Sequence, residues 1–449
     1  MKKIYLLMML MVIGLVTSMA QTIRYVKVGG TGDGTTWATA SGDLQATIDA
    51  SAVGDEVWVA AGTYTPTQKI ADFLKDGTTP TTARDQSFLL NPGVKVYGGF
   101  LGDETGPITT VARNFIANET ILSGDLGVDG KAYHVVTAFI PSASIDDTVL
   151  DGFTIKDGLA DGTETVNIGA DIVQSDGGGV NIFCEDGANK VALYNLVFLN
   201  NVSSANGAAI QIHARSGTPV VDVVNSKFIA NISGNRGGGI YFYGTGYSTG
   251  SKLNIINSHF DQNDAVSGAG LYSYNGWANI SGSIFENHTE RSIFVYTGTF
   301  TVDKSIFRNN TDAAGSAIYL SSGGTSIYPT ATITNSLFYD NEATATGTAN
   351  AGGAALYVNI YVRATVINST FYRNKSANAH GAITFNNAGN TTINLYNNIF
   401  HANYRTTNTA SVDVRLGYDA LGDFKNNLFQ VHNLAPVDNN NYIEDNPAN

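Results

Sequence analysis

The sequence predicts an all-β protein, a right-handed parallel β-helix with three strands in each coil, because two short motifs recur along most of its length. The first motif reads aliphatic-Asn-Ser-x-Phe-x-x-Asn, as in residues 224–231. The second is a glycine-rich string followed by an aliphatic and an aromatic residue, as in residues 237–241. The phenylalanines of the first motif are 22 to 33 residues apart, at Phe198, Phe228, Phe260, Phe285, Phe307, Phe338, Phe371, Phe400 and Phe429.

The repeat length decides between architectures. Each period contains two or three short β-rich runs separated by Gly, Asn and Ser, and none contains a helical pattern. A four-stranded propeller blade needs a longer period, whereas a solenoid coil of three short strands fits. Equivalent residues of stacked coils lie about 4.8 Å apart. We therefore expect Phe to stack on Phe inside the solenoid and Asn to hydrogen-bond to Asn along its axis. Parallel crossovers are right-handed in nearly all known folds.

The chain divides into four predicted segments. Residues 1–20 have a basic start, an apolar core and a small-residue end, which is the pattern of a signal peptide. Residues 21–138 lack the strict motifs and are predicted to form an N-terminal cap and the first coils, since a solenoid needs its first coil covered. Residues 139–430 are the β-helix repeat body, and residues 431–449 are a C-terminal linker or a truncated coil.

Several local elements are predicted around the first coils. Asp43–Ala50 has the pattern of a short amphipathic helix. Glu56–Ala60 and Val94–Phe100 read as strands, and residues 67–86 as a loop. Asp157–Asp176 is rich in Asp and Gly, and we expect it to be an insertion between coils.

Composition narrows the possible partners and the location. The net charge of −13 becomes −15 when the two lysines of the signal peptide are removed, so the phosphate attraction behind nucleic-acid binding is missing. No later segment is long and apolar enough to cross a membrane. Cys184 is left as a lone thiol, expected to be a buried strand residue. We expect a monomer that is secreted or displayed on the outer-membrane surface.

The paired Gly-Gly-x-Ile and Phe-x-x-Asn strings resemble the repeats of chlamydial polymorphic outer-membrane proteins. Residues 25–27 and 54–64 look like the start of large surface β-helix proteins of Bacteroidetes-type bacteria. The resemblance implies a secreted protein with the pectin-lyase-like fold. It leaves the activity open, because β-helices host adhesins, lyases and hydrolases alike.

The first candidate site is a stripe of aromatic residues. In the glycine-rich motif the aliphatic residue should point inward and the aromatic residue after it outward, as should the residue two positions further on. A flat aromatic stripe suits stacking against the sugar rings of an extended glycan. The alternative is that aromatic residues favour strands and stack well on like neighbours. The candidate ligand-binding residues are Tyr241, Tyr243, Tyr272, Tyr274, Phe294, Tyr296, Tyr319 and Tyr357.

The second candidate site is charged and lies on the shortest coil, Phe285–Phe307, which has His288 where the motif has Asn. Similarity to β-helix polysaccharide lyases, which use an Arg or Lys base and often carboxylate-bound Ca²⁺ beside it, makes this coil the catalytic candidate. The alternative is a solvated ladder in which Arg308 offsets two carboxylates, one of them Asp261 on the preceding coil. The candidate catalytic residues are Glu286, Arg291 and Arg308.

No other cofactor site is predicted. Aspartates in the glycine-rich loops could hold Ca²⁺, although their spacing fits no EF-hand or nonapeptide calcium pattern and ordinary turns explain them equally well. No His/Cys cluster suggests zinc, so no metal site is assigned. The aspartates concerned are Asp157, Asp161, Asp171, Asp176 and Asp186.

Three functions remain open from the sequence. The first is a non-catalytic adhesin or scaffold that binds a polysaccharide or a host surface glycoprotein. The second is a polysaccharide lyase or glycoside hydrolase acting on an extended glycan. The third is a passive surface spacer for a missing C-terminal domain. The regular repeats are stronger evidence for a scaffold than for a reaction.

Overall fold

The computed structural model describes residues 21–70, 82–141, 147–185, 187, 190–245, 250–323, 329–346, 352–377, 381–385, 391–406, 413–415 and 421–429. The predicted signal peptide, the predicted C-terminal segment and Asp186 lie outside these described residues. Among the described residues, no helix has the length and apolar character needed to cross a membrane.

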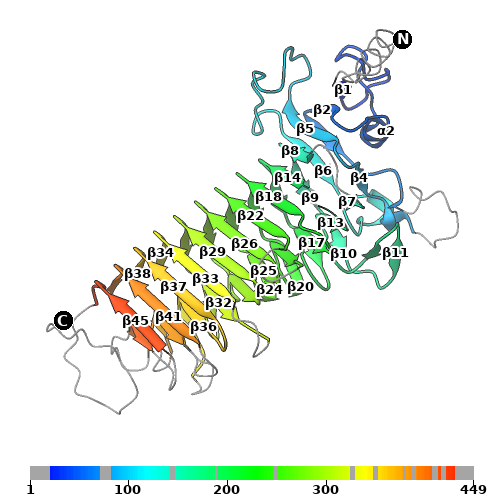
Figure 1. Ribbon diagram of the computed structural model, residues 1–449. Helices are drawn as coiled ribbons and strands as arrows, with labels where there is room; N and C mark the ends of the chain where they lie inside the picture. Colours follow the sequence, from blue (N-terminus) through cyan, green and yellow to red (C-terminus); the bar gives the residue numbers. More distant parts are fainter. Residues whose placement is uncertain are drawn as a thin grey trace, which may run out of the picture.

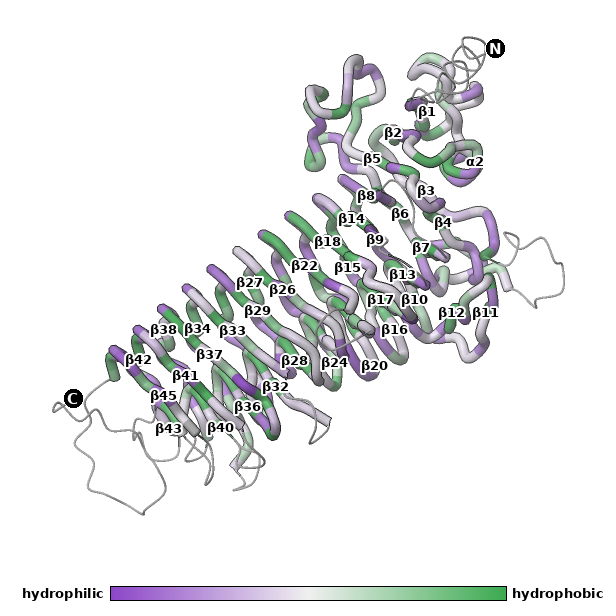
Figure 2. Tube along the Cα trace, viewed as in Figure 1, coloured by the Kyte–Doolittle hydropathy of each residue, from purple (hydrophilic) through white to green (hydrophobic). Residues whose placement is uncertain are grey.

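The chain winds into an elongated parallel β-helix, and the three-strand coils predicted from the repeats are confirmed (Figure 1). In each regular coil it visits an aromatic sheet, then a 13-strand sheet, then a Phe sheet. Each strand pairs in parallel with the equivalent strands of the coils before and after it. Hydrophobic and hydrophilic residues alternate along the stacked coils (Figure 2), because neighbouring side chains on a strand point to opposite faces.

The three long sheets run along the solenoid, and the spatial order of their strands follows the order of the coils. The aromatic sheet contains β4 (Phe88–Leu90), β7 (Val136–Ile140), β13 (Val180–Cys184), β17 (Ile210–Ala214), β21 (Ile240–Tyr243), β25 (Leu271–Tyr274), β28 (Ile293–Tyr296), β32 (Ile318–Ser321), β36 (Leu356–Val358), β40 (Ile383–Phe385) and β44 (Val414–Arg415). The 13-strand sheet contains β1 (Ile23–Val26), β2 (Glu56–Ala60), β5 (Lys95–Phe100), β8 (Thr148–Asp151), β14 (Lys190–Tyr194), β18 (Val220–Val224), β22 (Lys252–Ile256), β26 (Trp277–Ser281), β29 (Thr299–Asp303), β33 (Thr330–Thr334), β37 (Arg363–Ile367), β41 (Thr392–Tyr396) and β45 (Leu421–Lys425). The Phe sheet contains β3 (Gly62–Tyr64), β6 (Thr120–Ser123), β9 (Thr154–Lys156), β15 (Val197–Leu199), β19 (Lys227–Ile229), β23 (His259–Asp261), β27 (Ile284–Glu286), β30 (Ile306–Arg308), β34 (Leu337–Tyr339), β38 (Thr370–Tyr372) and β42 (Ile399–His401).

Short strands line the turn that leads from the Phe sheet back to the aromatic sheet. They form two four-stranded sheets, one on the earlier coils and one on the later coils. The first contains β10 (Leu159–Ala160), β16 (Val202–Ser203), β20 (Ile232–Arg236) and β24 (Asp264–Ser267). The second contains β31 (Thr311–Asp312), β35 (Glu342–Ala343), β39 (Lys375–Ser376) and β43 (Tyr404–Arg405).

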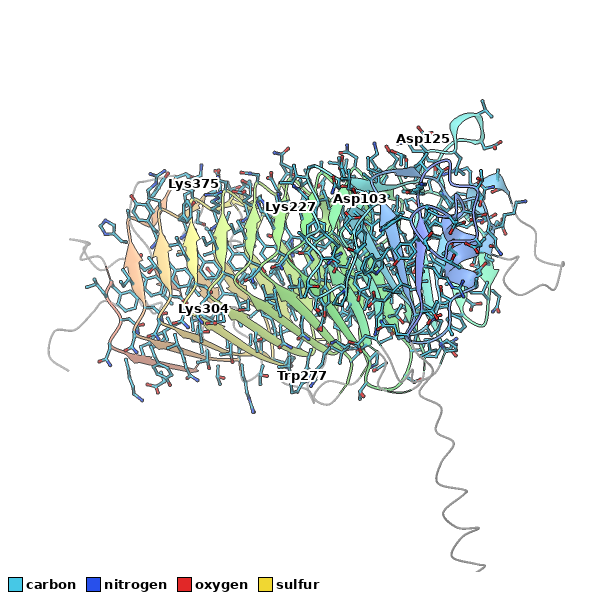
Figure 3. The ribbon with its side chains drawn as sticks, turned by 90° about the horizontal axis from the view of Figure 1, so that it is seen from above. Asp103, Asp125, Lys227, Trp277, Lys304 and Lys375 are labelled. Carbon is cyan, nitrogen blue, oxygen red and sulfur yellow. The ribbon has the colours of Figure 1, made fainter. Side chains whose placement is uncertain are left out.

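The interior of the solenoid contains the predicted stack of phenylalanines, one from each Phe-sheet strand between Phe198 and Phe400 and a last ring from Phe429. Adjacent rings have centroids 4.2 to 5.2 Å apart and lie within 16° of parallel. Aliphatic side chains from the other two sheets complete the same core. Seen from a second direction (Figure 3), side chains fill the space between the sheets and also project outward, with Lys227 and Trp277 on opposite sides.

Two kinds of left-handed residue make the coils close. The first Asn of the Phe motif has a positive φ, 52° at Asn225 and 50° at Asn257, and turns the chain from the 13-strand sheet into the Phe sheet. Asn tolerates this conformation better than most residues. Gly237, with φ 68°, begins the turn into the aromatic sheet, where a Cβ would lie 2.4 Å from the Ile240 carbonyl oxygen. The tight turn predicted for the glycine-rich string is therefore confirmed.

The last Asn of each motif forms the predicted axial ladder. The amide of Asn231 donates to the Oδ1 of Asn263 at 2.9 Å, and the amide of Asn341 donates to that of Asn374 at 2.9 Å. These side chains are buried, and from Asn231 onward each of these Asn amides also donates to the carbonyl oxygen of a Phe, 2.9 Å away for Asn263. The ladder satisfies polar groups that would otherwise be costly to bury.

One rung of the ladder is a histidine. His288 is fully buried and takes the place of Asn between Asn263 and Asn310. Its Nδ1 lies 2.9 Å from Asn310 Oδ1 and its Nε2 lies 3.5 Å from Asn263 Nδ2. This arrangement uses a neutral imidazole that donates from Nδ1 and accepts at Nε2. Burial is the largest cause that lowers the pKa of His288, to about 4.

The helix and the two strands predicted near the N-terminus are present, β2 with the predicted bounds and the other two shorter by one or two residues. The predicted helix is α2 (Leu44–Asp49), with the Asp43 side chain accepting a hydrogen bond from the Ala46 amide as N-cap. It buries Leu44 and Ile48 beside the first strands. Short 3₁₀ turns occur at Ala83–Asp85 and Gly127–Asp129. Strands β1 to β7 already belong to the three long sheets, and the capping role of this region stays a prediction.

The predicted insertion before β13 contains a two-stranded antiparallel hairpin, β11 (Thr165–Asn167) and β12 (Asp171–Val173). Its apolar residues pack on Phe183 and Phe139, which point outward from the aromatic sheet. The hairpin therefore covers the outer face of this sheet on its early coils.

Candidate functional site

The outer face of the aromatic sheet carries two columns of aromatic side chains in register. We call the column nearer the start of each strand the inner column and the column two residues further along the strand the outer column, although both lie on the outer face of the sheet. The inner column is Tyr241, Tyr272, Phe294, Tyr319 and Tyr357, and the outer column is Phe183, His213, Tyr243, Tyr274 and Tyr296. The register predicted from the glycine-rich motif is thus present in the sheet. Parallel pairing brings equivalent residues of successive coils side by side, which makes each column continuous.

The inner column is covered at three of its five residues, whereas Phe294 and Tyr319 are half-exposed. Tyr241, Tyr272 and Tyr357 are buried, so the exposed strip expected over all these coils is wrong for these three residues. Two arginines from the turn before the sheet lie over the column. The guanidinium carbon of Arg236 is 5.1 Å from the Tyr272 ring centroid, and that of Arg291 is 4.6 Å from the Tyr319 ring centroid. Cation–π attraction of this kind holds both layers together.

The phenols of the inner column are kept neutral. Burial raises the pKa of Tyr241 to about 12 and also raises the pKa of Tyr272 and of Tyr319 above the ordinary value. The Tyr319 hydroxyl accepts a hydrogen bond of 3.1 Å from Asn359. This column therefore acts as a packed support for the coils.

The outer column is half-exposed over Tyr243, Tyr274 and Tyr296. The ring centroids of Tyr243 and Tyr274 are 5.0 Å apart with planes 11° from parallel, and those of Tyr274 and Tyr296 are 5.4 Å apart and 15° from parallel. These values describe offset-stacked rings whose faces cover one another. Solvent therefore reaches the edges of these rings more readily than their faces. The expected flat platform of ring faces is wrong.

Both ends of the outer column are defined by neighbouring structure. At the early end the hairpin β11–β12 buries Phe183, whose ring lies 4.7 Å from that of His213. At the late end the rung after Tyr296 is Ser321, so the column of rings ends at Tyr296 among the residues that the structure describes. Gly323 lies so close that a Cβ there would be 2.0 Å from the Tyr296 hydroxyl oxygen. The half-exposed tyrosines thus lie on three successive coils, and His213 on the coil before them is half-exposed as well.

A charged group lies at the edge of this face, on the short coil. Arg291 Nε lies 2.8 Å from Asp312 Oδ2 without the alignment of a hydrogen bond, and the same guanidinium covers Phe294 and Tyr319. Burial, followed by the neighbouring Asp312 carboxyl group, raises the pKa of Glu290 to about 7. A carboxyl group whose pKa is close to neutral pH therefore lies next to the aromatic face.

The other two predicted catalytic residues belong to a separate cluster on the outer face of the Phe sheet. Asp261, Glu286 and Arg308 occupy successive rungs, so the predicted column is present. Glu286 is buried and bonds to Arg308 Nε and to His259 Nε2, the latter at 2.6 Å. Arg308 Nη1 also donates to the Tyr339 hydroxyl at 2.8 Å. Arg291 pairs instead with Asp312, so the predicted trio is divided between two groups of contacts.

The electrostatics of the Phe-sheet cluster oppose the predicted base. Hydrogen bonding to Glu286 is the first cause that raises the pKa of Arg308 above its already high ordinary value. Burial acts to raise the pKa of Glu286, but Arg308 and His259 overcome it and the pKa is lowered. A lyase base must lose a proton, and a guanidinium held charged by a carboxylate does this poorly.

The aspartates considered for Ca²⁺ are not gathered into one site. Asp157 pairs with Lys131 at 3.1 Å, and Asp161 pairs with Arg84 at 2.5 Å. Asp171 accepts from Asn167 at 2.8 Å, within the hairpin. Asp176 accepts from Asn206 and Gln211 near the start of the aromatic sheet. Each described aspartate of this set therefore has its own protein partner.

Comparison with known proteins gives likeness at the level of architecture only. No family model and no curated relative matches the sequence. The pectate lyase Pel9A structure has a TM-score of 0.40 and 13% identity, and the alignment covers 91% of this chain and 79% of that one. A rhamnogalacturonan lyase structure has a TM-score of 0.40 and 12% identity, and the alignment covers 90% of this chain and 87% of that one. PfbA, a surface adhesin of Streptococcus pneumoniae, has 0.39 and 13%, covering 86% of each chain. The fold assignment depends on the chain's own parallel sheets.

Sequence reasoning missed several members of these groups. Asp312 comes from the coil after Arg291, and His259 from the coil before Glu286, so neither contact has a signal in the local sequence. Arg236 follows the first Asn ladder residues and reaches forward to Tyr272. The register of the Phe positions could have placed His259 beside Glu286, since both flank a motif Phe.

Proposed function

We propose that this chain is an exported, non-catalytic β-helix that binds an extended glycan across the outer face of its aromatic sheet. The observation that carries the proposal is the half-exposed column of Tyr243, Tyr274 and Tyr296. Each of three successive coils contributes one of these tyrosines, and the column follows the solenoid axis. An extended polysaccharide, or the glycan of a host surface glycoprotein, offers a matching row of hydroxyl groups.

The column supports hydrogen bonding in preference to ring stacking. The stacked faces of the three rings already contact one another, whereas a phenol hydroxyl both donates and accepts a hydrogen bond. The rings themselves are rigid, so a ligand that binds them orders few side-chain torsions. Secretion or display on the outer surface belongs to the same proposal, and it is supported by the pattern of residues 1–20.

A glycan array with the mature protein tests the proposal, followed by the triple variant Tyr243→Phe/Tyr274→Phe/Tyr296→Phe. This variant keeps the stacked rings and removes only the three hydroxyls. A hydrogen bond contributes about 0.5–1.5 kcal/mol, so affinity should fall by roughly ten-fold or more. Tyr372→Phe removes a hydroxyl from an exposed tyrosine of the Phe sheet and is the matched control.

Two outcomes would reject this function. Binding of the triple variant equal to that of the parent protein would exclude the hydroxyl column. Absence of binding to any glycan would favour a passive spacer. The enzyme alternative is supported only by Glu290, whose pKa of about 7 suits a general acid. Turnover of any polysaccharide that is lost in Glu290→Gln would establish the enzyme instead.

A further inference from the structure

The Phe-sheet cluster brings three metal-ligating side chains together on one surface. His259 and Asp261 are alternate residues of β23, so both point outward. Glu286 is the parallel partner of Asp261 on β27. One ligand atom from each of the three residues lies within 4.8 Å of the others, the one such group among the described residues. The geometry combines two positions of one strand with one position of the next.

The burial of the cluster resembles that of a site with a fixed base and an open side. The Glu286 side chain is 9% exposed, whereas the His259 side chain is 34% exposed. The His259 Nε2 and Glu286 Oε1 atoms lie 2.6 Å apart. An ion between them requires only a small separation of two side chains at the surface. The backbone that carries them is fixed by the sheet.

The donor set selects the class of ion. One imidazole nitrogen and two carboxylates suit Zn²⁺ and similar first-row ions, whereas Ca²⁺ and Mg²⁺ prefer oxygen ligands alone. Three protein ligands leave at least one position for water. We propose that His259, Asp261 and Glu286 bind one divalent transition-metal ion, with Zn²⁺ the best match.

The surroundings of the cluster both support and weaken this site. Asn287 donates from Nδ2 to Asp261 Oδ1 at 2.7 Å and so orients that carboxylate. Arg308 bonds to the other oxygen of Glu286, Oε2, which leaves Oε1 on the His259 side. The positive charge of Arg308 opposes a cation. Two other carboxylates of the later coils differ, since Glu342 pairs with Lys375 and Asp340 with Arg373, and among the described residues neither pair belongs to a metal-ligating group.

Isothermal titration calorimetry of the untagged mature protein with ZnCl₂ in a non-chelating buffer tests the site. The visible absorption spectrum of bound Co²⁺ identifies the kind of ligands around the ion. We expect one equivalent of ion to bind. His259→Ala should weaken binding by at least ten-fold and change the Co²⁺ spectrum, and Asn287→Ala should weaken it by about ten-fold. His401→Ala, at an outward position of the same sheet, is the matched control and should bind as the parent does.

Arg308→Gln separates an ion at Glu286 from an ion elsewhere. Loss of the opposing charge should tighten Zn²⁺ binding, whereas unchanged or weaker binding would place the ion away from Glu286 and overturn the proposal. Absence of saturable binding in the parent protein, or unchanged binding in His259→Ala, would overturn it as well. Circular dichroism of each variant establishes that the β-helix is intact. None of these outcomes depends on the glycan function.

Discussion

The phenylalanine stack inside the solenoid and the tyrosine columns outside it have the same register, yet they differ in their surroundings. The interior rings from Phe198 to Phe400 are buried among the three sheets. In the inner column outside, three of the five residues are buried and two arginines lie over the rings, whereas the tyrosines of the outer column are half-exposed. Stacking in register follows from the repeat alone. Whether a stack supports the fold or presents a surface depends on the turns that flank it.

The largest expected difference concerns stability. Phe307→Ala removes a fully buried ring from the middle of the interior stack, and such changes cost about 3–5 kcal/mol of the free energy of unfolding. Tyr274→Ala, in the half-exposed outer column, should cost only about 1 kcal/mol. Urea unfolding followed by circular dichroism measures both. Equal losses would show that the outer column supports the fold as strongly as the interior phenylalanine stack does.

The second prediction uses the buried rung of the Asn ladder. The folded-state pKa of His288, about 4, lies below its ordinary value of 6.5. The unfolded chain therefore takes up the proton first as the pH falls. The contribution of neutral His288 to the free energy of unfolding is fully present above pH 6.5. It is lost as the pH falls toward 4, and the loss amounts to about 3 kcal/mol.

His288→Asn restores the residue of the motif and should flatten this part of the pH profile of unfolding. His134, also fully buried with its pKa lowered to about 4 chiefly by burial, stays in the variant and keeps its own share of the acid sensitivity. Urea midpoints measured between pH 7 and 4 make the comparison. A variant as acid-sensitive as the parent would exclude His288 as the cause.

The third prediction concerns the charged edge of the aromatic face. The pKa of Glu290 is raised to about 7, first by burial and then by the neighbouring Asp312 carboxyl group. Its contribution to stability is therefore present below pH 4.5, the ordinary value, and is lost as the pH rises through 7. Glu290→Gln should remove this pH-dependent loss of stability. The change in the free energy of unfolding should be small, because the Glu290 side chain is partly exposed. The urea midpoint between pH 5 and 8 tests it, and a parent protein equally stable across that range would contradict it.

The sequence predicted the fold because its strongest signals are periodic. Spacing between motif phenylalanines fixes the register of every sheet, so Phe228 lies over Phe260 and Asn231 over Asn263. The motif serine forms another ladder, in which the Ser226 amide donates to Ser258 Oγ at 3.2 Å. Its repetition was visible in the sequence although its contact was not anticipated.

The site was predicted less completely because its burial is decided by irregular segments. Tyr241 and Tyr357 have the outward positions expected of them, but neighbouring turns cover them. Arg291 lies on the short coil with Glu286, yet its partner is Asp312 from the next coil. Turn conformation and long side chains that cross between coils have no period in the sequence.

The smallest expected change in stability separates hydrogen bonding from ring stacking in the outer column. Tyr274→Phe keeps the ring and should alter the free energy of unfolding by less than about 0.5 kcal/mol, as surface changes usually do. Its glycan affinity should still fall, because one hydroxyl is lost.

Tyr274→Ala removes the middle ring and uncovers the faces of Tyr243 and Tyr296. If the ligand hydrogen-bonds to hydroxyls, both variants bind the glycan more weakly than the parent. If the ligand stacks on ring faces, the alanine variant binds as well as the parent or better, and glycan titration of the two variants distinguishes these modes.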